Sequence, residues 1–121
     1  DNLYHNNGID TDFDDDSELM LKRGRARITG NSGDLGKFRT PTLRNVEKTG
    51  PYMHDGRFAT LQQLIEHYNS GVLDSPTLDP LLKKNGKLGI VLSEAEKIQL
   101  ISFLKTLTDY EFLSSSRFSE L

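Results

Sequence analysis

Apolar residues recur at helical spacing in two segments of the chain. The first segment places them at i, i+3, i+4 and i+7, on one face of a helix: Leu61, Leu64, Ile65 and Tyr68. Thr60 precedes this run and Gln63 follows it three residues later, which is the pattern of an N-terminal capping box. Gly71 supplies a stop signal just beyond the run. The pattern predicts a helix over residues 60–69.

The second periodic segment begins with the same capping pattern, Ser93 followed by Glu96. A broad apolar stripe follows it, made of Ile98, Ile101, Phe103, Leu104 and Leu107. Three- and four-residue spacing of this kind indicates a helix with one buried face. We expect this helix to run over residues 93–108.

The remaining segments lack a helical or strand period. Residues 1–21 carry turn formers and scattered apolar anchors, and residues 23–33 lead into Asn-Ser-Gly turn chemistry, so little regular structure is expected there. Pro41 and Thr42 favour one helical turn over residues 43–46. Prolines and glycines interrupt residues 72–92, which predicts an extended loop rather than a strand. A chain of 121 residues with this pattern fits one domain that is mostly α-helical with long loops.

Composition points to a thin core. Counted with glycine and without tyrosine, apolar residues make up about 40% of the chain, below the roughly 45–50% of ordinary globular domains. Such a domain tends to leave apolar surface in need of cover, so association into a homo-oligomer is an expectation. No run of about eighteen apolar residues occurs, which excludes a membrane-spanning helix by sequence.

Charge is unevenly distributed along the chain. Seven acids and no Lys or Arg precede Lys22, and they are read as a solvated acidic loop: Asp1, Asp10, Asp12, Asp14, Asp15, Asp16 and Glu18. Setting these seven aside from the formal net charge of −3 leaves +4 for the remainder. That charge is too small and too scattered for a nucleic-acid-binding surface.

Residues 40–56 combine rigid backbone with chemically active side chains. Two prolines and two glycines fix the chain where periodic structure is absent, and loops of this kind often carry function. They bracket Arg44, Met53 and His54. Arg44 can hold a carboxylate or fasten loop carbonyls, and Met53 can ligate a metal, although filling a gap suits its flexible side chain better. His54 either contacts a cofactor, oriented by Asp55, or satisfies loop carbonyls.

The motifs of this stretch resemble those of a known family. Thr-Pro-Thr-Leu-Arg-Asn-Val, Gly-Pro-Tyr-Met-His-Asp-Gly and Thr60-Leu61 are similar to the C-terminal haem domain of bacterial di-haem cytochrome c peroxidases and of the related methylamine-utilisation maturases. The likeness extends from residue 1 to about residue 113. It implies a partial class I cytochrome c-like domain and a periplasmic location.

One departure from the family pattern concerns the cofactor. The family attaches each haem c through a Cys-x-x-Cys-His motif, and this chain contains no cysteine. In the family the second such motif lies shortly before a segment similar to residues 1–8, so the chain is expected to be a fragment that lacks its haem-bearing front. A fragment of this kind is not catalytic by itself, and its partner is the missing N-terminal haem domain.

The resemblance also assigns roles to residues. The family spacing from His54 places the distal ligand of the haem iron at Tyr68, where peroxidases usually have Met and the maturases have Tyr. The structural alternative for Tyr68 is an amphipathic residue that ends an apolar helical face. Arg44 and His54 would line the haem edge, and the backbone carbonyls of Thr49 and Pro51 match positions that help to bind calcium in the family.

Three functions follow from these implications. The first is a part of a periplasmic peroxidase, which reduces hydrogen peroxide to water with electrons from a small donor protein. The second is a haem-free periplasmic interaction module. The third is a tyrosine-ligated, maturase-like haem oxidase that acts on a protein substrate.

Overall fold

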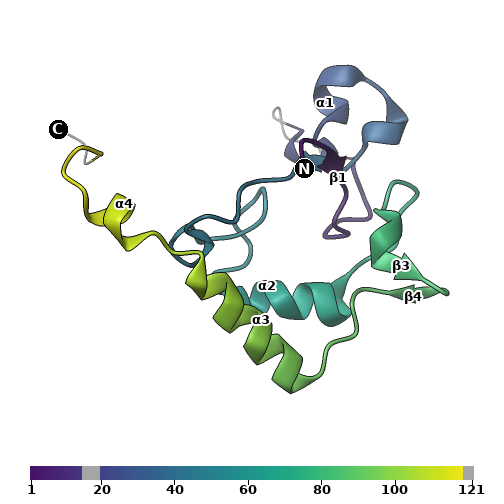
Figure 1. Ribbon diagram of the computed structural model, residues 1–121. Helices are drawn as coiled ribbons and strands as arrows, with labels where there is room; N and C mark the ends of the chain where they lie inside the picture. The colour runs from purple at the N-terminus through teal and green to yellow at the C-terminus, as the bar shows by residue number, and fades with distance from the viewer. Residues whose placement is uncertain (15–19, 119–121) are drawn as a thin grey trace.

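The computed structural model describes residues 1–14 and 20–118 (Figure 1). Asp15, Asp16 and Glu18 of the acidic run lie outside the described residues. Two helices, α2 (Leu61–Glu66) and α3 (Glu94–Thr106), lie side by side. Both begin with the capping boxes predicted from the sequence, in which the Thr60 and Ser93 side chains accept from the backbone N–H groups of Gln63 and Glu96. The two predicted helices are therefore confirmed.

The first of these helices ends differently from the prediction. After Glu66 the chain continues into η4 (His67–Gly71), a turn of π-helix. The helical segment therefore reaches Gly71 rather than residue 69, and α3 ends at Thr106 rather than at residue 108. A π-helical turn is rare and often marks a functional site.

Two small antiparallel sheets accompany the helices within the described residues. Strand β1 (Tyr4–His5) pairs with β2 (Phe38–Arg39), and β3 (Lys83–Lys84) pairs with β4 (Lys87–Leu88). The second sheet is a hairpin and follows a short 3₁₀ helix, η5 (Pro80–Leu82). The prediction of an extended loop over residues 72–92 is therefore wrong here. Asn85 and Gly86 take positive φ angles of 51° and 75°, which is the geometry of a tight hairpin turn.

Short helical turns also occur where little regular structure was expected. They are η1 (Leu21–Arg23), α1 (Ala26–Thr29) and η2 (Ser32–Asp34). The single turn predicted over residues 43–46 is displaced to η3 (Val46–Lys48), because Asn45 has a φ of 61° and a right-handed helix cannot run through it. A further helix, α4 (Tyr110–Ser114), lies beyond the end of α3 and away from the other elements (Figure 1).

Buried apolar residues form two separate clusters in the part of the chain that the structure describes. The first joins Val46, Leu61, Ile65 and Leu104, and the second joins Val72, Leu78 and Leu82. The helical segment α2–η4 connects the clusters, since its first turns belong to the first cluster and Tyr68 packs against the second. The fold is thus helical with small sheets. None of the helices in the described residues is long and apolar enough to cross a bilayer.

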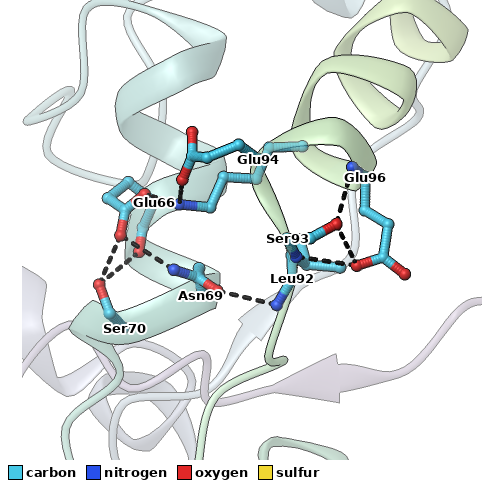
Figure 2. Close-up of polar contacts among 8 residues, drawn as sticks. Glu66, Asn69, Ser70, Leu92, Ser93, Glu94 and Glu96 are labelled. Carbon is cyan, nitrogen blue, oxygen red and sulfur yellow. Dashed lines mark hydrogen bonds and ion pairs between the residues drawn. The ribbon is translucent and has the colours of Figure 1, made fainter.

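A polar network links α2 and η4 to the start of α3 (Figure 2). Lys97 Nζ contacts Glu66 Oε2 at 2.5 Å and Glu94 Oε1 at 2.9 Å. The Leu92 N–H donates to the Asn69 side chain at 2.9 Å, so the segment before α3 is also tied to η4. This network fixes the two helices to each other at the end where Tyr68 lies.

Candidate functional site

Tyr68 lies in the π-helical turn η4 and is held there through its backbone. Its carbonyl accepts a hydrogen bond of 2.7 Å from the Ile90 N–H. Gly89 makes this approach possible, because a Cβ at its position would lie 2.7 Å from the Tyr68 carbonyl oxygen. The half-buried Tyr68 side chain packs against the second apolar cluster. Neighbouring segments therefore fix where the phenol group lies.

Asn7 joins the Tyr68 side chain to Met53. Its Nδ2 atom donates to Met53 Sδ at 3.1 Å and contacts Tyr68 Oη at 3.4 Å. The backbone carbonyl of Asn7 accepts from His67 Nε2 at 2.9 Å, and His67 is buried within η4. Asn7 Oδ1 is buried and has no hydrogen-bond partner among the described residues. We call Asn7, Met53 and Tyr68 the amide cluster.

The loop that carries Met53 is fixed by Arg57. Arg57 donates to Asp55 Oδ2 at 2.7 Å, to the Ile9 carbonyl at 2.8 Å and to Asp10 Oδ1 at 2.9 Å. These bonds raise the pKa of Arg57 and, despite burial, leave the pKa of Asp55 below its usual value. Met53 itself has a φ of 73°, which is uncommon for a residue other than glycine. Arg57 therefore clamps this loop onto the N-terminal segment that contains Asn7.

His54 points to different partners from Met53. Its ring stacks on Phe38 with a centroid distance of 4.1 Å, and its Nε2 atom lies 3.9 Å from Asp10 Oδ2. The His54 side chain is 10% exposed, and its burial lowers its pKa although Asp55 and Asp10 oppose this shift. His54 also lines a cavity of about 270 Å³ together with Arg25, Lys37 and other residues. The structure does not bring His54 into the amide cluster.

Arg44 and the two calcium candidates lie elsewhere. Arg44 pairs with Asp109 at 2.6 Å, and its guanidinium lies 4.9 Å from the centre of the Phe112 ring. Asp109 caps α4, so Arg44 fastens the C-terminal helix to the loop before η3. Thr49 and Pro51 are exposed in the loop between η3 and Tyr52. No group of three or more His, Cys, Asp or Glu side chains in the described residues could hold a metal ion.

The comparisons with known proteins agree on one family. No family model matches the chain. Over 80 residues it is 44% identical to the cytochrome-c peroxidase IdrP1 of Denitromonas iodatirespirans, covering 66% of this chain and 20% of that protein. It is 39% identical over 85 residues to the cytochrome c551 peroxidase of Nitrosomonas europaea, covering 70% of this chain and 21% of that protein.

A maturation protein and a solved structure extend this agreement. The methylamine utilization protein MauG of Methylorubrum extorquens is 32% identical over 107 residues, or 88% of this chain and 27% of MauG. The crystal structure of a MauG-like protein associated with microbial copper homeostasis is 39% identical, with a TM-score of 0.74 over 98% of this chain and 38% of that protein. The chain belongs to the family of cytochrome c peroxidases and MauG proteins. It spans about a fifth to a quarter of the length of these curated relatives.

The amide cluster fits one side of the haem that this family implies. A phenol oxygen and a thioether sulfur are both known axial ligands of haem iron, and they meet here beside a buried amide oxygen that has no hydrogen-bond partner in the described part of the chain. Covalent attachment does not fit, because the chain has no cysteine. The residues present can therefore supply an axial ligand but not the thioether links.

Sequence reasoning did not single out Asn7 or His67. Both contact residues about 46 to 61 positions away in the chain, and a one-dimensional pattern does not carry such contacts. The one local signal was the Asn6-Asn7-Gly8 run, in which Gly8 has a φ of 67°. Met53 was read as more suited to filling a gap than to ligation, and the structure places its sulfur against the Asn7 amide.

Proposed function

We propose that this chain forms the distal side of the C-terminal haem site in a di-haem, peroxidase-like protein of the periplasm. Tyr68 would supply the axial oxygen ligand to the haem iron. The observation that carries this proposal is the amide cluster, which presents a phenol oxygen held by η4, Gly89 and Asn7. The family relationship supports the choice of haem as the cofactor.

The chemistry of a tyrosine ligand suits an electron-relaying or oxidising haem. Haem c would bring one-electron redox chemistry to the site, and a hard oxygen ligand favours the ferric state. The residues of this chain would hold the Tyr68 phenol oxygen in place. The second apolar cluster, against which Tyr68 packs, would keep water from that side of the ring. Cysteines for covalent attachment would have to come from outside the chain.

The activity proposed for the whole protein is reduction of hydrogen peroxide to water, with two electrons supplied by a small donor protein. The other haem domain would be the partner that completes the protein. Calcium between the two domains, with the carbonyls of Thr49 and Pro51 as ligands, belongs to the same proposal.

A MauG-like function is the second candidate. Two observations favour it: the residue at the proposed ligand position is Tyr68 rather than methionine, and the MauG-like structure matches almost the whole chain. In that case a protein substrate would be oxidised, and hydrogen peroxide would be the oxidant that is reduced to water. If the chain were an interaction module without haem, the amide cluster would only stabilise the fold and would bind no iron.

A haem peptide supplied in trans tests the haem site. The probe is a c-type haem peptide that carries Cys-x-x-Cys-His and has an open distal position. We expect saturable binding with a change in the visible spectrum, and we expect Tyr68→Phe to abolish that spectral change. Tyr110→Phe serves as a matched control, since Tyr110 is 65% exposed on α4. Absence of binding, or equal spectra for Tyr68→Phe and the unmodified chain, would overturn the proposal.

Two further measurements separate the candidates. The coding sequence upstream of Asp1 should contain a Cys-x-x-Cys-His motif, and its absence would favour the interaction module. The chain itself should carry no covalent haem, because thioether links need cysteine. After acid–acetone extraction, a pyridine haemochrome spectrum of the purified chain should show no c-type signal.

A further inference from the structure

One amide hydrogen-bond donor lies between two side chains that can both bind iron. Asn7 Nδ2 is 3.1 Å from Met53 Sδ and 3.4 Å from Tyr68 Oη. Met53 comes from a loop and Tyr68 from η4, so they reach the amide from different elements. A thioether and a phenol differ strongly as ligands, because sulfur stabilises ferrous iron and oxygen stabilises ferric iron. Which of them is presented therefore decides the redox character of the site.

Hydrogen bonds fix the backbone of the segment from which the Asn7 side chain projects. The Asn7 carbonyl accepts from buried His67, and the Gly8 carbonyl accepts from the Leu73 N–H at 2.8 Å. Gly8 cannot be replaced without a shift, because a Cβ there would lie 2.7 Å from Val72 Cγ1. Asn6 is 2% exposed and donates from its own amide to Thr77 at 2.9 Å. The Asn7 side chain thus starts from a rigid, buried segment.

The two contacts of the amide are not equivalent. The contact with sulfur is the shorter one although thioether sulfur is the weaker acceptor, so the N–H group lies against the sulfur and draws electron density from an atom that is already a weak electron-pair donor. The phenol oxygen is the stronger acceptor and has the longer contact, so the same N–H group hinders it less. It can keep the bond to Asn7 and still offer a lone pair to iron.

We propose that Asn7 is a positioning residue that selects Tyr68 oxygen over Met53 sulfur as the ligand presented to iron. This inference rests on the haem site proposed above. Asn7 itself does not touch the iron in this proposal. Its contact with Met53 keeps the sulfur from binding iron, and its contact with Tyr68 orients the phenol.

The first test needs no haem and uses the methyl resonances of the methionines. The chain has two methionines, so Met20 is an internal reference in the same spectrum as Met53. We expect Asn7→Leu and Asn7→Asp, which cannot donate to sulfur at neutral pH, to shift the Met53 methyl resonance and to leave that of Met20 in place. Asn2→Leu is the control, because Asn2 is exposed in the same N-terminal segment.

The second test uses the haem peptide in trans. In the Asn7 variants we expect a sulfur-to-iron charge-transfer band to appear and the reduction potential to rise as Met53 competes with Tyr68. Adding Met53→Leu to Asn7→Leu should remove both changes. If Asn7→Leu does not fold, as judged by circular dichroism, Asn7→Asp gives the test because it conserves the shape of the side chain.

The outcomes distinguish this inference from the haem proposal. If Tyr68→Phe does not alter the bound haem peptide, the haem site itself is wrong. If Tyr68→Phe alters it while both Asn7 variants leave the Met53 methyl resonance, the spectrum and the potential unchanged, then Asn7 does not select the ligand and the inference is overturned.

Discussion

Single residues at close backbone approaches hold this site together. Gly89 is the clearest case. It has a φ of 80°, and a Cβ at its position would clash with the carbonyl oxygens of Tyr68 and Asn69. The hydrogen bond from Ile90 to the Tyr68 carbonyl depends on that approach. A glycine outside every motif of the sequence therefore sets the position of the candidate ligand.

Gly89→Ala should destabilise the chain by roughly 1–3 kcal/mol, because the substitution adds a clash with two carbonyl oxygens to the strain of a positive φ. Urea denaturation followed by circular dichroism measures the effect. The matched control is Gly86→Ala in the neighbouring hairpin, where φ is 75° but a Cβ would meet nothing within 4 Å. Equal losses for the two variants would show that the contact with η4 does not matter.

At the scale of elements, capping decides where the helices begin. Ser93 accepts from the Glu96 N–H at 3.3 Å, and the Glu96 carboxylate accepts from the Ser93 N–H at 2.8 Å. Ser93→Ala should lower the free energy of unfolding by about 0.5–2 kcal/mol, since it removes the side-chain acceptor of α3. Thermal and urea unfolding check this value. Ser102→Ala on the exposed side of α3 should have a smaller effect.

The network between α2 and α3 predicts an acid-dependent stability. Hydrogen bonds from Lys97, Ser70 and Asn69 lower the pKa of Glu66 from 4.5 to about 2 (Figure 2). A lowered carboxyl pKa means that the folded state binds fewer protons, so stability is fully present above pH 4.5 and is lost as pH falls toward 2. Other carboxylates with lowered pKa values, among them Asp79 and Asp109, contribute to the same acid limb.

Glu66→Gln should make the free energy of unfolding fall less steeply as the pH is lowered from 4.5 toward 2. Stability measured across this pH window, at low and at high salt, tests the prediction, because the Glu66 side chain is half exposed to solvent and salt weakens its ion pair. Glu111→Gln on α4 is the control. An unchanged slope in Glu66→Gln would remove the network from the account of acid stability.

Local signals in the sequence account for the helices and not for the site. Capping residues and apolar spacing act within one or two turns, so α2 and α3 were predictable. The hairpin around Asn85-Gly86 carried a known turn signal, but the surrounding lysines and glycines gave no strand period. The α4 helix was not foreseen because its cap, Asp109, is held by Asn45 and Arg44 from far along the chain.

The site shows the same limit. Tyr68 was identifiable through the family resemblance and its position on the helix. The amide cluster was not identifiable, because Asn7 meets Met53 and Tyr68 only through tertiary folding. His54 and Arg44, named from the same constrained stretch, contact Phe38 and Asp109 instead of each other.

For the whole molecule, exposed apolar side chains predict self-association. Ile98 is 65% exposed and Phe103 56% exposed on α3, and α4 adds Tyr110, Phe112 and Leu113. Apolar surface of this kind favours contact with a second copy. Sedimentation equilibrium should show dimers or larger species at high micromolar concentration. A compact monomer that binds no hydrophobic dye would contradict this expectation.

Substitution on α3 gives a direct check of that surface. Ile98→Asp and Phe103→Asp should shift the species toward monomer, because each places a charge in the apolar surface. Gln99→Asp adds the same charge at an exposed position of the same helix and should leave the association unchanged. Equal behaviour of all three variants would exclude α3 from the contact.

The separation of the apolar residues into two clusters has a kinetic consequence. Because α2 begins in one cluster and its continuation η4 ends in the other, each end of that segment can open without the other. Amide hydrogen exchange should therefore resolve two groups of protected amides, with Leu64 and Ile65 in one and Leu82 in the other. Substitutions around Leu104 could then speed local opening near α3 while the amides around Tyr68 exchange as slowly as before.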